Sequence, residues 1–141
     1  MKTRTLCTLA LIALVVGAGP HAAQPQSPVD REQVAVAFAG ALPNVPGKTL
    51  TAVVVSYSPG AKSTSHRHAG SVFVYVLTGS IRSENSATGP AKVYRAGETF
   101  FEPPGSDHLV SENASTTEPA SLLAVFVADD GARLTAPTPG R

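Results

Sequence analysis

Two histidines separated by a single residue, His66 and His68, are the part of this sequence with the clearest chemical potential. Residues two apart on a β-strand point to the same face, so both imidazoles could reach one ion with little adjustment. A third histidine, His108, follows later in the chain, and imidazole suits several divalent first-row transition metals. An isolated His-x-His pair is more often structural than metal-binding, so the prediction of a metal site depends on the residues around it.

The residues around these histidines form two ordered motifs. The first runs from Gly60 to Gly79 and contains the His-x-His pair, and the second runs from Gly97 to Asn113 and contains His108. Together they resemble the two motifs of the cupin family, and the resemblance extends from about Leu50 to Ala128. Either motif alone would be weak support, whereas the two together are specific.

This resemblance implies an all-β fold, the cupin double-stranded β-helix or jelly-roll barrel, with one divalent transition metal in its mouth. His66 and His68 would come from one strand and His108 from another. Iron is the ion expected first, with manganese, nickel, zinc and copper as alternatives, because all occur in the family and imidazole binds several of them. The resemblance also implies a small-molecule substrate or ligand and is compatible with a homodimer.

The sequence departs from the family pattern at Val72, where many cupins place a glutamate as a fourth ligand. Three neutral histidines would leave the full charge of a dication in place, which favours an anionic chelating ligand such as an enolate or α-keto acid. Glu102, six residues before His108, resembles a glutamate of the cupins that cleave β-diketones. Three roles stay open for it: a fourth ligand, a base that orients bound water, or an exposed carboxylate at a strand end.

Two further residues are weaker candidates for a catalytic role beside Glu102. Arg82 could neutralise an anionic substrate, and Tyr75 could donate a hydrogen bond to it. Such residues are more often found on the surface or at the edge of the core, so both are secondary to the histidines and Glu102.

The amino-acid composition limits both the possible fold classes and the possible binding partners. The 141 residues indicate one domain, and 12 glycines and 12 prolines divide the chain into short β-type segments without a helical period. This pattern is typical of an antiparallel sandwich or barrel. Charged residues make up 15% of the chain and the formal net charge is +1, so nothing argues for nucleic acid or for electrostatic membrane binding.

The first 23 residues have the pattern of a signal peptide. Lys2 and Arg4 precede an apolar run, Leu9 to Val16, which is too short to span a bilayer comfortably. We therefore expect an exported protein, periplasmic or secreted, with no membrane attachment once this segment is removed. Its removal would also remove Cys7, the one cysteine of the chain.

Three segments are predicted after the signal peptide. Residues 24–48 are a leader, in which Gln33 to Leu42 fits either a short helix or a strand. Residues 49–130 form the barrel. Residues 131–141, rich in proline and glycine, are a flexible tail.

The leading functional hypothesis is a metal-dependent oxygenase acting on a small oxygenated molecule such as a diketone or keto acid. The alternative is a non-catalytic cupin that binds a metal or a small ligand, because a fold alone does not decide function. A lyase or isomerase that uses the metal only as a Lewis acid is a third hypothesis. Valine at position 72 favours the binding module, and the three histidines favour the enzyme.

Overall fold

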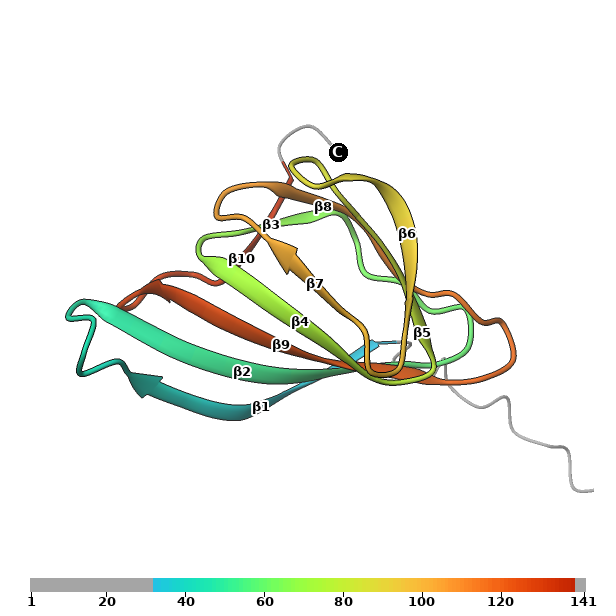
Figure 1. Cartoon of the computed structure of the whole chain (residues 1–141), viewed down its shortest axis with the longest axis horizontal. Coiled ribbons are helices and arrows are strands. Elements are labelled where there is room, and N and C mark those ends of the chain that lie inside the picture. The colour runs from blue at the N-terminus through green and yellow to red at the C-terminus, as the bar shows by residue number, and fades with distance from the viewer. Residues whose placement is uncertain (1–31, 139–141) are drawn as a thin grey trace, which may run out of the picture.

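Every regular element that the computed structural model describes is a β-strand, and the described residues are 32–138 (Figure 1). The predicted signal peptide, residues 1–23, lies outside this range. Among residues 32–138, no helix is long and apolar enough to cross a bilayer. The strands are, in chain order, β1 (Glu32–Ala41), β2 (Lys48–Tyr57), β3 (His66–His68), β4 (Ser71–Thr78), β5 (Ser80–Asn85), β6 (Gly89–Arg95), β7 (Thr99–Glu102), β8 (Asp107–Asn113), β9 (Ala120–Asp129) and β10 (Thr135–Pro137).

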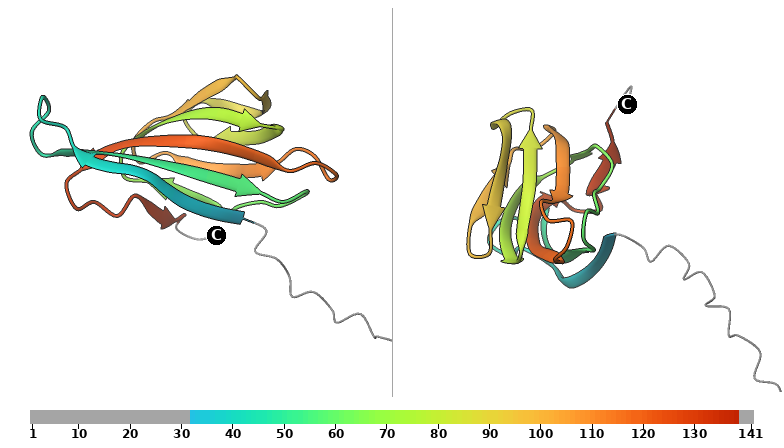
Figure 2. Two further views of the ribbon diagram at one scale, coloured as in Figure 1. Left: turned by 90° about the horizontal axis from the view of Figure 1, so that it is seen from below. Right: turned by 90° about the vertical axis from the view of Figure 1, so that its right-hand side faces the viewer.

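These strands form two antiparallel sheets of five strands each. One sheet has the order β1-β2-β9-β4-β7 and the other the order β10-β3-β8-β5-β6, so most neighbours in space are distant in sequence. Figure 2 shows the two sheets facing each other around a common interior. The all-β jelly-roll architecture predicted from the sequence is confirmed.

Alternation along the strands decides which side chains enter the interior. On β4, Val72, Val74 and Val76 are buried, and the residues between them point outward. β9 alternates in the same way along its length. The inward residues form one apolar core, whose members are Val53, Tyr57, Ala61, Val72, Val74, Val76, Ile81, Ala120, Leu122, Ala124 and Phe126.

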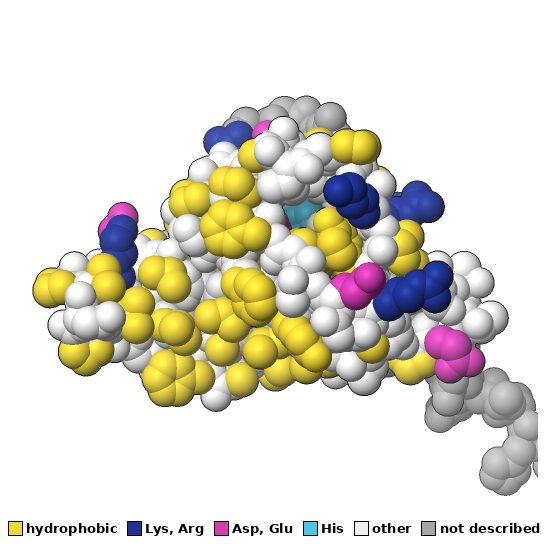
Figure 3. Space-filling view, viewed as in Figure 1, with side chains coloured by type: hydrophobic (Ala, Val, Ile, Leu, Met, Phe, Trp, Pro, Cys, Tyr) yellow, Lys and Arg dark blue, Asp and Glu magenta, His cyan; other side chains and the backbone are white. Residues whose placement is uncertain are grey.

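Apolar side chains also cover much of the molecular face seen in Figure 3. Phe73 and Phe101, which are paired across β4 and β7, are each about half exposed. In the same view the surface is hollowed, and a histidine side chain is visible inside the hollow. The interior is therefore accessible from this side.

Two strands extend the barrel beyond its predicted bounds. β1 occupies part of the expected leader and pairs with β2 along its length, so the ambiguous stretch is a strand. β10 occupies part of the expected flexible tail and pairs with β3, the strand of His66 and His68. Pro137 is tolerated in β10 because this is an edge strand, where a missing N–H leaves no ladder bond unmade.

Gly70, in the turn between β3 and β4, allows this turn to lie against β9. A Cβ atom at this position would lie 2.2 Å from the carbonyl oxygen of Val127, so a side chain has no room. Because Gly70 follows His68 by two residues, this close approach helps to fix where the His-x-His strand ends.

Candidate metal centre

Three histidine side chains meet inside the barrel. β3 supplies His66 and His68, and β8 supplies His108, which lies directly opposite His66 in the ladder between the two strands. One ring nitrogen from each residue lies within 4.8 Å of the other two. Metal–nitrogen bonds of about 2.0–2.1 Å place the ligand atoms of one ion roughly 3–4 Å apart, so this spacing fits a single ion.

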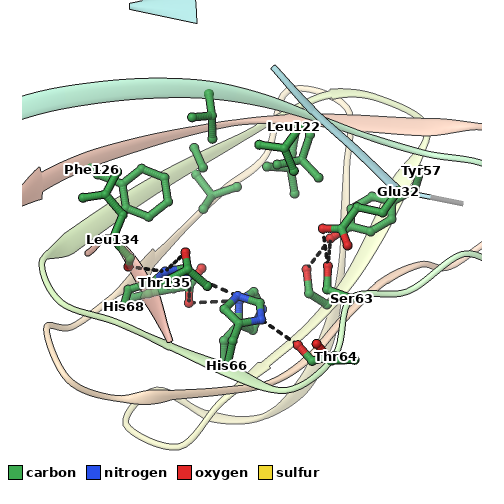
Figure 4. A pocket seen from close by; sticks show the side chains of 18 of the residues that line it. Glu32, Tyr57, Ser63, Thr64, His66, His68, Leu122, Phe126, Leu134 and Thr135 are labelled. Carbon is green, nitrogen blue, oxygen red and sulfur yellow. Dashed lines mark hydrogen bonds and ion pairs between the residues drawn. The ribbon is translucent and has the colours of Figure 1, made fainter. Parts of the chain in front are cut away.

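The hydrogen bonds of the first two rings decide which nitrogens are free. Nδ1 of His66 lies 2.7 Å from the carbonyl oxygen of Thr64, and Nδ1 of His68 lies 3.2 Å from that of Leu134 (Figure 4). A carbonyl only accepts, so each Nδ1 carries the hydrogen and each neutral ring keeps its lone pair on Nε2. Donation from the second ring nitrogen to a carbonyl is also what orients histidines that bind metals.

The two Nε2 atoms of His66 and His68 are 3.1 Å apart. Two lone pairs at this distance repel each other, whereas a cation held between them would bind both. The third ring has a buried Nδ1 that forms no aligned hydrogen bond, although it lies close to Glu102. The histidine donors therefore fit a divalent metal ion, and all three predicted ligands lie where one ion can be held.

Glu102 points into the barrel beside these rings. Its side chain is 3% exposed, and Oε2 lies 3.0 Å from Nδ1 of His108 and 3.7 Å from Nε2 of His68. Asn85 also donates a long hydrogen bond of 3.4 Å to the same oxygen. The interpretation as an exposed carboxylate at a strand end is wrong, because strand alternation turns Phe101 outward and Glu102 inward.

Charges in the site favour the protonation states that a metal needs. Burial lowers the pKa of His68, and the nearby Glu102 only partly opposes this, so the ring is neutral near pH 7. Burial alone would raise the pKa of Glu102, but its interactions with His108, and then with His68 and His66, outweigh burial and lower it. An ionised carboxylate thus lies beside imidazoles that can bind a cation.

The histidines and Glu102 line a cavity of about 390 Å³ in the barrel interior (Figure 4). This volume is near the lower end of the range for small-molecule sites, so it suits a small ligand. Much of the wall is apolar and comes from β2, β4 and β9. These apolar residues include Val53, Val55, Val74, Leu122, Ala124 and Phe126.

The two weaker catalytic candidates do not line this cavity. Tyr75 lies between the inward residues Val74 and Val76 on β4, so it is exposed on the outer face. Arg82 lies between two buried residues of β5, and its Nε is 3.6 Å from Oε1 of Glu112 on the outside. Neither side chain is brought to the histidines, because each occupies the outward position in its strand.

Sequence analysis missed a polar group that does line the cavity. Tyr57, Ser63, Ser111 and Glu32 come from separate segments and contact one another there. One signal was available for Tyr57, since strict alternation along β2 places it on the same face as Val53. The other three could not be assigned without the register of the sheets.

Family comparison agrees with the fold and with the site. The cupin domain model matches residues 53–126, slightly more than half of the chain. This chain belongs to the cupin family. The matched range contains the three histidines and Glu102, which confirms the resemblance seen in the two motifs. None of the curated proteins compared with this cupin matches it.

Solved structures share the fold of this cupin. DMSP lyase DddQ from Ruegeria pomeroyi superposes with a TM-score of 0.63 at 20% identity, over 79% of this chain and 55% of that chain. A conserved protein with a double-stranded β-helix domain from Klebsiella pneumoniae gives 0.59 at 23% identity, over 76% and 84%. Oxalate decarboxylase of Bacillus subtilis, which has Mn(II) centres, gives 0.52 at 26% identity, over 62% and 23%. This cupin thus spans about half of the lyase chain and about a quarter of the decarboxylase chain.

Proposed function

We propose that this cupin binds one divalent transition-metal ion through His66, His68 and His108 and acts as an enzyme on a small oxygenated molecule. The observation that carries the proposal is the approach of the Nε2 atoms of His66 and His68 to 3.1 Å, beside the buried Glu102 carboxylate in a cavity. The reaction that we propose is oxygen-dependent cleavage of a diketone or keto acid, with iron as the metal.

The chain's own residues would divide the work between binding and proton transfer. A bound divalent ion supplies Lewis-acid activation and, if it is redox-active, the capacity for oxygen chemistry. The three histidines contribute no charge, so an anionic oxygen chelator is attracted to the site. Glu102 can offset part of the metal's charge as a ligand, or accept a proton from the substrate as a base.

The buried position of Glu102 favours an enzyme over a non-catalytic binding module. Valine at position 72 left the site without a carboxylate, which was the reason to prefer a binding role. Because Glu102 lies 3.0 Å from His108 inside the barrel, that reason no longer applies. The fold also occurs in a lyase and in a decarboxylase with Mn(II) centres, which supports an enzymatic role.

A second candidate reaction is proton abstraction without oxygen, as in a lyase or isomerase. The specific observation in its favour is the position of the Glu102 carboxylate, 3.0 Å from Nδ1 of His108, where it can act as a base next to a metal that would polarise the substrate. Its interactions with the histidines lower its pKa, which favours the ionised form that a base needs. This reaction needs the metal only as a Lewis acid.

One experiment separates these functions. The purified protein is loaded in turn with Fe(II), Mn(II), Ni(II), Zn(II) and Cu(II), and metal content is measured by elemental analysis. Oxygen uptake and product formation are then followed with a panel of β-diketones and α-keto acids. Oxygen uptake supports the oxygenase, and product without oxygen uptake supports the lyase or isomerase. Metal without any turnover favours the binding module, and absence of bound metal overturns the proposal.

A further inference from the structure

A second polar group, distinct from Glu102 and the histidines, lines the same cavity. It consists of Glu32, Tyr57, Ser63 and Ser111, and we name these four residues the hydroxyl chain. In the view of Figure 4, its labelled members Glu32, Tyr57 and Ser63 lie on the side opposite His68. The four residues come from β1, β2, the segment before β3, and β8, so they are assembled only by the fold.

Each hydrogen in the hydroxyl chain has a determined direction. Ser63 donates its hydroxyl hydrogen to Oε1 of Glu32 at 2.7 Å. Its bond with Tyr57, at 2.6 Å, must therefore be donated by the tyrosine. Tyr57 has then used its only hydrogen, so its bond with Ser111, at 2.9 Å, is donated by the serine.

This order makes the hydroxyl chain an accepting surface. All three hydroxyl hydrogens are used within the chain, and lone pairs remain on its oxygens. Ser63 donates to Oε1 of Glu32, so the second carboxylate oxygen can accept another hydrogen bond. A ligand group that meets this surface must therefore donate, and the negative charge favours a cationic donor over a neutral one.

Much of the remaining cavity wall is apolar. Val53, Val55 and Leu122 lie on this wall, and they offer no hydrogen bond to a ligand. Polar recognition is thus available at the histidine site and at the hydroxyl chain, and the apolar part of the wall offers neither a donor nor an acceptor.

We propose that the substrate has two polar ends joined by a short apolar spacer. One end is an oxygen chelator that meets the histidine site, and the other is a hydrogen-bond donor, a hydroxyl or a protonated amine, that meets Glu32 and the hydroxyl chain. This inference rests on the proposed function, because the chelating end requires the metal. It adds the chemistry of the remote end, which the metal site does not specify.

A series of hydroxamates that differ in spacer length and end group tests this inference, because hydroxamates chelate divalent ions through two oxygens. The series has aliphatic spacers of three to five carbons that end in a methyl, hydroxyl, ammonium or carboxylate group. Binding is followed by the visible absorption of the Co(II)-loaded protein, which needs no turnover. We expect the ammonium-ended ligand of the best length to bind about tenfold or more tightly than its methyl-ended match, and the carboxylate-ended ligand to bind least.

Variants of the hydroxyl chain link this preference to its residues. Glu32→Gln keeps the size of the side chain and removes its charge. The affinities for the ammonium-ended and methyl-ended ligands should then differ by less than about threefold. Ser63→Ala breaks the chain next to Glu32 and provides a second variant if the first does not fold. The control is Glu118→Gln, an exposed residue outside the cavity, which should keep the wild-type preference.

The outcomes distinguish this inference from the proposed function. Any one of three results would overturn the two-ended substrate without affecting the metal site. These are equal affinities of the wild type for all the ligands, tightest binding of the carboxylate-ended ligand, and an ammonium preference unchanged in Glu32→Gln. Failure of the protein to bind Co(II) would overturn the proposed function, and this inference with it. An ammonium preference that is lost in the hydroxyl-chain variants and kept in Glu118→Gln supports both the two-ended substrate and the metal site.

Discussion

Val72 and Glu102 lie directly opposite each other in the ladder between β4 and β7. Directly opposite residues on antiparallel strands point to the same face, with Cβ atoms about 5 Å apart, and both side chains are buried. The position at which many cupins carry a glutamate is thus valine in this chain, and its cross-strand partner supplies a carboxylate. The barrel interior keeps an acid although a different strand delivers it.

Glu102→Gln tests what this carboxylate does. If Glu102 is a metal ligand, the variant should bind metal roughly 10–100-fold more weakly, the range seen when groups supporting a site are removed. If it is a base, metal content should stay constant and turnover should fall. Isothermal titration with the metal and a turnover assay separate the two roles, and a variant unchanged in both would remove Glu102 from the mechanism. Glu118→Gln is the control for loss of one surface charge.

The cross-strand relationship predicts rescue by a swap. In the double variant Val72→Glu/Glu102→Val, the carboxylate moves to the facing position and the buried volume is nearly conserved. If Glu102 is a metal ligand, we expect metal affinity within about tenfold of the wild type, and above that of Glu102→Val alone, because the acid still faces the histidines. Affinity no better than that of the single variant would show that the two positions are not equivalent.

Each histidine of the site should be required for metal binding. Replacing His66, His68 or His108 by Ala removes one of three nitrogen donors, so metal content after dialysis should fall strongly in each case. The metal should also raise the melting temperature of the wild type and not of the variants, because the ion binds the folded state. A His108→Ala protein with full metal content would exclude His108 from the site.

Leu134 and strand β10, which follows it, should matter for the metal although they contribute no ligand. The carbonyl of Leu134 accepts from Nδ1 of His68, and Thr135 Oγ1 lies 3.3 Å from the same nitrogen. Deleting residues 134–141 removes these partners and should weaken metal binding about 10–100-fold. Deletion of 139–141 alone is the matched control, and equal affinities for the two truncated proteins would show that β10 does not orient His68.

Tyr57 should make the fold sensitive to alkaline pH. Burial raises its pKa, and its hydrogen bonds to Ser111 and Ser63 offset this only in part. An unfolded tyrosine ionises near pH 10, so above that pH the unfolded state loses this proton first and unfolding becomes more favourable. Between pH 9 and 11, Tyr57→Phe should therefore lose less of its unfolding free energy than the wild type. Parallel curves in denaturant titrations would contradict this.

Export is predicted from the amino-terminal residues. If residues 1–23 are a signal peptide, the protein recovered from the native host's exported fraction should begin between about Gly19 and Pro25. Amino-terminal sequencing or intact mass measures this directly. An exported protein that still begins at Met1 would be incompatible with cleavage.

The sequence by itself determined the fold class and identified the three candidate metal ligands. Alternation in segments such as Ser71–Thr78, divided by glycine and proline, is a local property that needs no partner strand to be recognised. The spacing of His66 and His68 likewise places both rings on one face of a single strand. With His108 in its own motif, these local patterns carried the resemblance to the cupin family, and that resemblance implied a jelly roll with a three-histidine site.

Only the tertiary structure decided which other side chains face the cavity and where the barrel ends, because both depend on the pairing of distant strands. Glu102 could be assigned to the interior only once its register with Val72 was known, since a shift of one residue would turn it outward. Tyr75 and Arg82 were lost as candidates for the same reason. β10 pairs with β3, and the hydroxyl chain joins Glu32 to Ser111 across the barrel. Contacts of this kind come from long-range packing, which a single sequence does not display.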